Sequence, residues 1–332
     1  MPKTISTLNN LSKIIAVVGI LGVWSCQSHK KEVITLAHGL DQQHSVHKAM
    51  LKLGEVLYEK SGGTMEVRVY PSQQLGNERE LLELLQLGSV DITKVSTAVM
   101  ENFVPEYKVF SLPYVFINKE HAFAVLDGEV GERILKSGEK VRLHGLGYYD
   151  SGSRSFYTKS TPVDQPSDLK GLKIRVQESV TAMAMVEAMG GAPTPIAFGE
   201  LYTALQAGVV DGAENNPPSF YLTRHYEVCR YYSINEHSRV PDVLLMSAHT
   251  WDRLSSQERQ WVAAAVKESV DFQRELWEQS EQEALNAVIE HGVTVSYPEK
   301  TNFEKIVEDL KATYAQDPLV HGLLEDIEKL KP

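Results

Sequence analysis

Short apolar strands alternate with amphipathic helices along this chain, and that order limits the fold more than any other feature of the sequence. In the first third, strand, helix, strand, helix and strand are expected in turn over residues 33–39, 45–63, 64–71, 77–88 and 89–97. This β-α-β-α-β order predicts an open α/β sheet. In such sheets, ligands bind outside the carboxyl ends of the strands.

The same pattern restarts near residue 141, which predicts a second α/β unit. The expected elements there are strands over residues 141–150, 168–176, 191–198 and 209–216, and helices over residues 178–191 and 199–208. Residues 230–248 supply further strands, at a point where two-domain chains often cross back to the first domain. A chain of 332 residues is long enough for two domains with cores of their own. The sequence therefore predicts a two-domain α/β fold.

The longest expected element begins at Ser255 and ends before Gly292. Ser255 and Glu258 form a capping-box pair, and apolar residues recur at near-helical spacing as far as Val288. About 36 helical residues would extend roughly 54 Å, which exceeds the diameter of one domain. An unbroken helix would therefore run along both domains. The alternative is two helices with a break near residues 279–282.

The N-terminus has the features of a secretory signal peptide over residues 1–25. Two lysines precede the apolar run of residues 14–24, which is too short for a stable transmembrane helix. Cys26 is the last residue of a VWSC sequence that resembles a bacterial lipobox, although Trp24 occupies a position where a small residue is usual. We expect Cys26 to be lipidated and residues 26–32 to form a tether. The alternative is a free N-terminal cysteine.

The charge balance argues against a polyanionic partner. The chain has 33 Lys and Arg against 44 Asp and Glu, a net charge of −11, and removal of residues 1–25 with their two lysines gives 31 − 44 = −13. The sequence has no stripe rich in Lys and Arg, so nucleic acid binding is not expected. A small anion can still bind to a few arginines inside a cleft. Since Cys229 is the only other cysteine, no disulfide is expected.

Sequence templates for enzymes and metal sites do not match. Residues 152–156 (GSRSF) lack the second glycine of a nucleophile elbow, and residues 145–150 (GLGYYD) fall short of a dinucleotide fingerprint. His38, His44 and His47 have neither an HExxH motif nor a cysteine partner. We therefore expect no enzyme activity, no metal site and no cofactor.

Polar side chains follow three of the expected strands in the second unit. Arg154 comes shortly after the first of these strands, Arg175 lies near the end of the second, and Asn215 follows the last. Two guanidiniums in one crevice could clamp a carboxylate through planar, charge-assisted hydrogen bonds, and Asn215 could donate or accept beside them. For Arg175 the alternative is solvation, because it shares the polar face of its strand with Lys173.

From Val33 onward the chain resembles the DctP-type solute-binding subunits of tripartite ATP-independent periplasmic (TRAP) transporters. The stretches that carry the resemblance occur in the right order and cover most of the chain: VYPSQQLGNERE, LPYVF, GSRSFYTK, DLKGLKIRV, GAPTPIAFGELYTALQAGVVDGAENNP and LSSQERQWVAAA. Their joint pattern is highly specific to this family.

The resemblance implies roles for individual residues. Arg175 would form the main ion pair with a ligand carboxylate, Arg154 would be a second basic residue near it, and Asn215 would fix the orientation of the carboxylate. Glu78 would face the ligand, although as a helix N-terminal acid it could equally interact with the helix dipole. Phe198 would line the cleft floor. Two further residues lie in loops that vary with the ligand: His38 and Ser96.

The resemblance also implies two α/β domains joined by a hinge and spanned by a long helix. We expect domain I to comprise residues 33–150 and about 240–275, and domain II residues 151–239 and about 276–332. Domain closure would bury the ligand, and the closed form would dock on TRAP membrane subunits. The expected location is the periplasm, where a lipid at Cys26 would anchor the protein to the membrane.

The two arginines and Asn215 would together bind one carboxylate of the ligand. The remaining expected cleft residues suit hydroxyl groups. These are His38, Gln42, Glu78, Asp150, Asn216 and His237. Because Glu78 and Asp150 would repel a second carboxylate, a polyhydroxylated monoacid is favoured over a small dicarboxylate. The sequences LAHG, YYDSGSRSFYT and DGAENNP are similar to those of family members that bind glucuronate or galacturonate.

Three alternatives stay open. The ligand could be another monocarboxylate, such as a keto acid. The protein could serve a sensor rather than a transporter, since both would use the same cleft. Asp150 could be a turn residue that does not contact the ligand.

Overall fold

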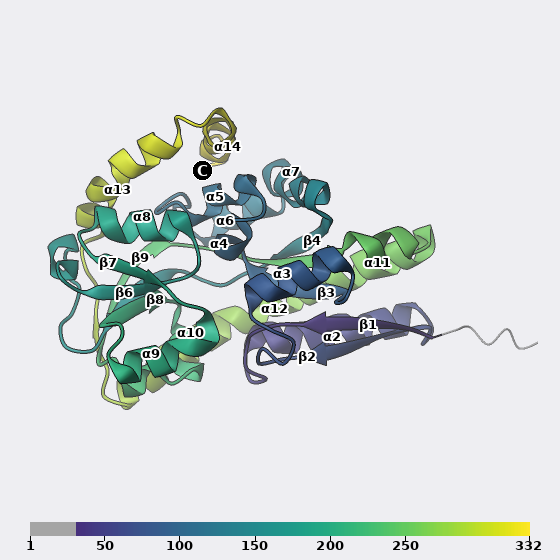
Figure 1. Cartoon of the computed structure of the whole chain (residues 1–332), viewed down its shortest axis with the longest axis horizontal. Coiled ribbons are helices and arrows are strands. Elements are labelled where there is room, and N and C mark those ends of the chain that lie inside the picture. Colours follow the sequence, from purple (N-terminus) through teal and green to yellow (C-terminus); the bar gives the residue numbers. More distant parts are fainter. Residues whose placement is uncertain (1–30) are drawn as a thin grey trace, which may run out of the picture.

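The structure, a computed structural model, describes residues 31–332, so the expected signal peptide and Cys26 lie outside the described residues. Two domains are present, each built on one mixed sheet (Figure 1). The first sheet has the order β2-β1-β3-β10-β4. Its strands are Glu32–Ala37 (β1), Met65–Tyr70 (β2), Ile92–Ser96 (β3), Leu143–Tyr149 (β4) and Asp242–Ser247 (β10). β1 pairs in parallel with β2 and β3, and β10 pairs antiparallel with β3 and β4.

The second sheet has the order β11-β9-β5-β8-β6-β7. Its strands are Arg154–Thr158 (β5), Lys173–Val176 (β6), Ala192–Pro195 (β7), Gly212–Asn215 (β8), Tyr231–Ser238 (β9) and Thr294–Ser296 (β11). β6 pairs in parallel with β7 and β8, whereas β5 is antiparallel to β8 and β9. Since β10 returns to the first sheet after the second sheet has begun, neither sheet is built from one continuous stretch of sequence.

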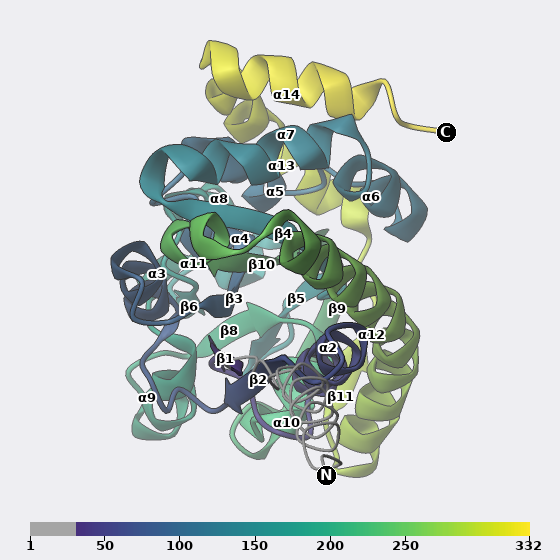
Figure 2. The ribbon, with the colours of Figure 1, turned by 90° about the vertical axis from the view of Figure 1, so that its right-hand side faces the viewer.

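Helices cover both faces of the two sheets (Figures 1 and 2). In the first domain these are Ser45–Lys60 (α2), Glu78–Leu87 (α3), Thr97–Met100 (α4), Lys108–Ser111 (α5), Lys119–Leu126 (α6), Glu129–Ser137 (α7) and Ala248–Arg253 (α11). In the second domain they are Val180–Ala188 (α8), Leu201–Ala207 (α9) and Pro217–Leu222 (α10). The last three are Ser256–Glu290 (α12), Lys300–Tyr314 (α13) and Pro318–Glu328 (α14).

The long helix α12 is unbroken over 35 residues and contacts both domains. Its capping box forms as predicted, because Ser255 accepts from the backbone of Glu258 and the Glu258 side chain accepts from the backbone of Ser255. Val262 and Trp277 pack into a core of the first domain, and Val288 packs into a core of the second. The prediction of one helix along both domains is confirmed, and the alternative of a break near residues 279–282 is wrong.

The last two helices bridge the domains. Phe303 and Val307 of α13 pack into a core of the second domain, whereas Val320 and Leu323 of α14 pack into a core of the first. Figure 2 shows α14 beside α7 at one end of the molecule. The sequence-based bounds placed residues 276–332 in domain II, and α14 departs from that assignment. Apolar residues recur at helical spacing in α14, but this spacing does not reveal which domain the helix packs against.

Two adjacent segments carry the chain between the sheets, one from β4 to β5 and one from β9 to β10. Asp150 in the first accepts from Nη1 of Arg239 in the second at 2.5 Å, and the Ser151 hydroxyl donates to the carbonyl oxygen of Val240. From α12, Gln273 accepts from the backbone N–H of Asp150 and donates to its carbonyl, both at 2.8 Å. The crossing segments are thus tied to each other and to α12.

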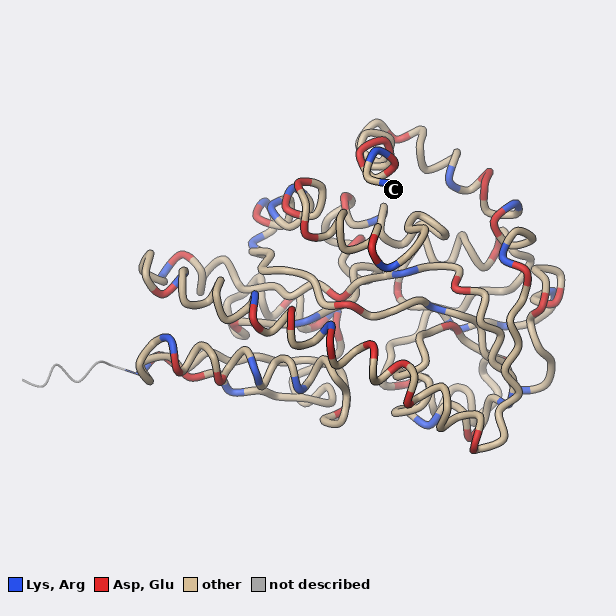
Figure 3. Tube along the Cα trace, turned by 180° about the vertical axis from the view of Figure 1, so that it is seen from behind, with Lys and Arg blue, Asp and Glu red and all other residues tan. Residues whose placement is uncertain are grey.

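Charge is mixed over the described part of the chain. In the view of Figure 3, basic and acidic residues are interspersed along the helices of both domains. Within residues 31–332, no helix is both long and apolar enough to span a membrane.

Candidate ligand-binding cleft

A cleft lies between the two domains, at the carboxyl ends of β3 and β6. It contains two small adjoining cavities. Four residues line both cavities: Leu40, Glu78, Gln177 and Phe198. Since the lining comes from both domains, a molecule in this cleft would contact both at once.

Arg175 is a buried cation without a carboxylate partner among the described residues. Its side chain is 2% exposed, and Nε donates to the carbonyl oxygen of Ile196 at 2.9 Å. Nη1 is buried and has no hydrogen-bond partner, and Cζ lies 5.9 Å from the ring centroid of Phe198. Burial lowers the pKa of this guanidinium, because removal from water disfavours the charged form. An anion in the cleft would compensate that cost.

Arg154, in contrast, already has its counterion. Nη2 donates to Oε1 of Glu214 at 2.8 Å, and Nε donates to the other oxygen of the same carboxylate. Burial would raise the pKa of Glu214, but the charge of Arg154 and the polar contacts with Arg154 and His237 outweigh burial and hold that pKa at about 2. Arg154 was expected to be a second basic residue beside the ligand carboxylate, and its charge is already neutralised by Glu214.

Asn215 and Asn216 join Arg154 to the loop that follows β8. Oδ1 of Asn215 accepts from Nη1 of Arg154 at 2.8 Å and from the backbone N–H of Asn216 at 2.9 Å. Asn216 caps α10, where its Oδ1 accepts from the backbone of Ser219 at 2.8 Å, and its Nδ2 donates to the carbonyl of Ser151 at 2.9 Å. These bonds commit Oδ1 of Asn215 and leave its Nδ2 hydrogens available to a ligand.

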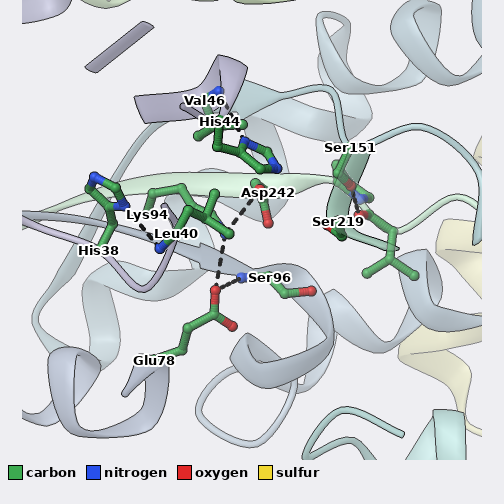
Figure 4. A network of polar contacts seen from close by, with 12 residues as sticks. His38, Leu40, His44, Val46, Glu78, Lys94, Ser96, Ser151, Ser219 and Asp242 are labelled. Atoms are coloured by element: carbon green, nitrogen blue, oxygen red, sulfur yellow. Dashed lines mark hydrogen bonds and ion pairs between the residues drawn. The ribbon is translucent and has the colours of Figure 1, made fainter. Parts of the chain in front are cut away.

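On the opposite wall, Lys94 of β3 lies between two carboxylates. Its Nζ is 3.1 Å from Oε1 of Glu78 and 3.0 Å from Oδ2 of Asp242, and its side chain is 3% exposed (Figure 4). Oε1 of Glu78 also accepts from the backbone N–H of Ser96 at 3.2 Å. Burial would lower the pKa of Lys94, but Asp242 and Glu78 outweigh burial and raise it.

The structure places seven of the ten predicted ligand residues in the lining of this cleft: Glu78, Ser96, Arg154, Arg175, Phe198, Asn215 and Asn216. They come from strand ends, a strand start and helix starts that are distant in sequence. Their roles toward a ligand stay predictions.

Three predicted residues do not line the cleft. His38 is turned to its neighbours: Nε2 lies 2.9 Å from Nδ1 of His47, and Nδ1 accepts from the backbone of Leu40. Asp150 pairs with Arg239 between the crossing segments. His237 lies behind Arg154, with Nε2 3.5 Å from the Glu214 carboxylate. The partners of Asp150 and His237 are distant in sequence, whereas those of His38 lie within nine residues of it.

Other cleft residues escaped the sequence analysis, notably Lys94, Asp242 and His44. His44 caps α2 with Nδ1, which accepts from the backbone of Val46 at 3.2 Å, and its buried Nε2 has no partner. Burial, with Lys94 nearby, lowers the pKa of His44 to about 3, so the ring is neutral and Nε2 is a free donor. The one feature of the sequence that could have pointed to His44 is its position directly before a helix, where it acts as the N-cap.

Over residues 31–332, no three His, Cys, Asp or Glu side chains are grouped as ligands for a metal ion. What the cleft offers is one unpaired guanidinium and a set of hydrogen-bonding groups from two domains. Two α/β domains around such a cleft define the class of two-domain solute-binding proteins.

Comparisons with known proteins agree with this class. The model of the family of bacterial extracellular solute-binding proteins, family 7 (DctP), matches residues 36–317. The uncharacterized protein YiiZ of Salmonella typhimurium is 40% identical over 319 residues, which cover 96% of this chain and 97% of that protein. The C4-dicarboxylate-binding periplasmic protein DctP of Rhodobacter capsulatus is 33% identical over 263 residues, or 79% of each chain.

Solved structures give the same result. A TRAP periplasmic solute-binding protein from Bradyrhizobium in complex with α/β-D-galacturonate has a TM-score of 0.88 and 39% identity, and covers 90% of this chain and 100% of that one. One from Chromohalobacter salexigens with bound D-glucuronate has a TM-score of 0.88 and 32% identity, with the same coverage. This chain therefore belongs to the DctP family of TRAP solute-binding proteins, a family of extracytoplasmic transport components.

Proposed function

We propose that this protein captures a hexuronate, glucuronate or galacturonate, and that Arg175 holds its carboxylate. The observation that carries the proposal is the buried Nη1 of Arg175, which has no partner in the described chain. A charged donor in this state is costly, and a bidentate carboxylate would satisfy it. Arg154, held by Glu214, would orient Asn215 and contribute its remaining donor.

The charges of the cleft favour one carboxylate over two. Its lining holds three cations, Lys94, Arg154 and Arg175, and three carboxylates, Glu78, Glu178 and Asp242. Of these cations only Arg175 lacks a carboxylate partner among the described residues. A small dicarboxylate would bring a second charge with no free cation to meet it. A sugar acid would bring hydroxyl groups, which suit the remaining polar atoms.

The related structures support the same ligand class. The neighbours from Bradyrhizobium and Chromohalobacter salexigens were crystallised with galacturonate and glucuronate. The relative from Rhodobacter capsulatus is named for C4-dicarboxylates, so family membership alone does not select the acid. Another monocarboxylate, such as a keto acid, is the second candidate, because Arg175 would bind its carboxylate equally well.

The test is a thermal-shift screen of hexuronates, aldonates, keto acids and C4-dicarboxylates, followed by calorimetry on those that stabilise the protein. We expect glucuronate or galacturonate to give the largest shift, since a ligand that binds only the folded state raises the melting temperature. C4-dicarboxylates should give little shift. If no hexuronate binds while a dicarboxylate does, the proposal fails.

Several further expectations for this chain belong to the proposal. We infer that it delivers its ligand to TRAP membrane subunits in the periplasm and has no enzyme activity of its own. We also infer that Cys26, outside the described residues, is lipidated and anchors it. Vesicle uptake with the adjacent membrane subunits separates a transporter from a sensor. Metabolic labelling with a radioactive fatty acid, lost in Cys26→Ser, tests the anchor, and unchanged ligand after prolonged incubation tests the absence of turnover.

Domain closure around the ligand completes the proposal. Domain I would comprise residues 33–150 and about 240–275 together with α14, and domain II residues 151–239 and about 276–317. The hinge would be the two crossing segments between Tyr149 and Arg154 and between Ser238 and Asp242. Ligand contacts made only in the closed state would shift the equilibrium toward closure.

A further inference from the structure

Lys94 is a buried lysine in the middle of a cleft wall, in a place where the fold does not need one. β3 is buried along its whole length, and the other side chains of Ile92–Ser96 are apolar or small hydroxyls. A buried ammonium loses its hydration at high cost unless partners replace it. Here the partners come from two different elements, Glu78 at the start of α3 and Asp242 at the start of β10.

The three side chains form a row of acceptor, donor and acceptor. Lys94 has three ammonium hydrogens, of which two point at the carboxylates. Glu78 uses Oε1 toward Lys94 and the backbone of Ser96, and Asp242 uses Oδ2 toward Lys94. One carboxylate oxygen on each side and one ammonium hydrogen in the middle therefore stay available. Figure 4 shows this arrangement.

All three side chains line the same cavity as Arg154 and Asn215, which come from the other domain. A ligand held by its carboxylate at Arg175 and covered by the second domain would present its remaining atoms to this row. Each hydroxyl can donate to a carboxylate oxygen and accept from an ammonium. An unsubstituted methylene can do neither, and it would leave desolvated charged groups without a partner.

We propose that Lys94, held between Glu78 and Asp242, determines specificity by reading neighbouring hydroxyl groups of the bound sugar acid. This inference rests on the proposed function, since it concerns the far end of the same ligand. The charge of the row is negative, with two carboxylates to one ammonium, so it also rejects a second carboxylate. Recognition of hydroxyls therefore lies on the first domain and recognition of the carboxylate on the second.

The experiment is a thermodynamic cycle between Lys94→Met and mono-deoxy hexuronates, with dissociation constants from calorimetry. For the wild type, at least one mono-deoxy acid should bind roughly tenfold or more weakly than its parent, because a charged group then lacks its partner. In Lys94→Met the same pair should differ by less than about twofold. Arg175→Lys should weaken parent and deoxy acid by a common factor.

A purely structural role for Lys94 predicts another result, in which Lys94→Met weakens every acid by one common factor. That result, or wild-type affinity for the parent, would overturn the inference. If Lys94→Met does not fold by circular dichroism, Asp242→Asn replaces it, because the amide keeps the shape and removes one charged acceptor. Asp242→Asn should also lose the preference for the parent over at least one deoxy acid, and a preserved preference overturns the inference.

The same data separate this inference from the proposed function. If the wild type prefers another hydroxylated acid to every hexuronate, the uronate proposal fails, and the cycle is run with that acid and its deoxy analogue. Loss of the hydroxyl preference in Lys94→Met then still supports the role of Lys94. If the preferred acid has no hydroxyl group, both proposals fail.

Discussion

Arg154 and Glu214 form a buried ion pair across β5 and β8, with Nη2 2.8 Å from Oε1, while Arg175 on the next strand has no such partner in the described chain. Two arginines close together would repel each other if both were unpaired. The internal carboxylate of Glu214 neutralises Arg154, so Arg175 is the one of these two guanidiniums that is left without a counterion. We therefore expect the cleft to favour a monoanion over a dianion.

Removal of the Arg175 guanidinium should abolish most of the affinity. We expect Arg175→Ala to weaken sugar-acid binding by about 30-fold or more, because losing one member of a buried, hydrogen-bonded charge pair costs roughly 2–5 kcal/mol. Arg175→Lys should also weaken it, since one point charge replaces a two-point fork. Calorimetry measures both. Lys173→Ala, at an exposed position of the same strand, is the control, and near-wild-type affinity of Arg175→Ala would sink the assignment.

Loss of Glu214, the internal counterion of Arg154, should lower the stability of the fold and not only affect ligand binding. Glu214→Gln leaves Arg154 charged and buried, and breaking such a pair destabilises a protein by roughly 3–5 kcal/mol. The measurement is urea unfolding without ligand. Asp271→Asn removes the acid of the exposed pair Lys267–Asp271 and should change little, because such pairs are screened by water. Equal effects of the two variants would show that the Arg154 pair is not the source of the stability.

The hinge can be tested through Gln273. Its side chain is fully buried, and its two 2.8 Å hydrogen bonds satisfy the backbone N–H and carbonyl of Asp150. Gln273→Met keeps the volume and leaves both groups unpaired, each at a cost of roughly 1–3 kcal/mol. The matched control on the same helix is Gln279→Met, whose side chain bonds only to the exposed Glu283. If both variants unfold at the same urea concentration, this contact does not stabilise the crossing segment.

Sequence periodicity predicted the fold where local rules decide it. The strand–helix order and α12 followed from apolar spacing and from the cap at Ser255. The short helices between residues 97 and 137 and the strand β5 were missed, because elements of four to nine residues carry little periodicity and depend on tertiary packing. The place of α14 was missed for a related reason, since an amphipathic helix does not specify which of two cores it covers.

The sequence likewise predicted those site residues that follow from local rules and missed those whose contacts depend on tertiary packing. The strand-end rule brought Arg175 and Asn215 together, since they lie at the carboxyl ends of the parallel strands β6 and β8. Arg154 lies instead at the start of β5, which is antiparallel to β8, so that rule does not account for its place. The rule could not reveal that Glu214 would neutralise Arg154, because that contact depends on the register of β5 against β8. A lone lysine in an alternating strand, such as Lys94, is usually solvated, and its two acids lie far away in sequence.

Asp242 should make binding and stability depend on pH in opposite directions. Burial raises the pKa of Asp242 from 3.8 to about 6, although Lys94 opposes the shift. Because the folded state then binds the proton more tightly than the unfolded state, the contribution of this group to stability is present at low pH and is lost as the pH rises through about 6. Sugar-acid affinity should fall as the pH drops through about 6, because protonated Asp242 loses its charge toward Lys94 and the ligand.

The measurement for Asp242 is calorimetry between about pH 8 and about pH 5, a range in which the ligand carboxylate stays ionised. Asp242→Asn should bind more weakly than the wild type at about pH 8 and should show a flatter pH profile. An identical profile in wild type and variant would assign the pH dependence to another group.

Glu101 connects the domains beside the cleft and should control closure without reading the ligand. At the end of α4 in the first domain, its Oε1 accepts from the Ser179 hydroxyl at 2.7 Å and from the backbone N–H of Thr181 at 3.0 Å, both at the start of α8 in the second. If the domains separate as proposed, these bonds would break, so we expect them to stabilise the closed state. A receptor that populates its closed state less binds every ligand more weakly by one factor.

We therefore expect Glu101→Ala to weaken all acids that bind by a common factor of roughly tenfold, from the loss of two hydrogen bonds to a charged group. Dissociation constants for two acids of different affinity are compared, and their ratio should match that of the wild type. Glu132→Ala, which removes the acid of an exposed pair within α7, serves as the control. A change in the ratio would place Glu101 in ligand recognition instead, and unchanged affinities would show that closure does not depend on this contact.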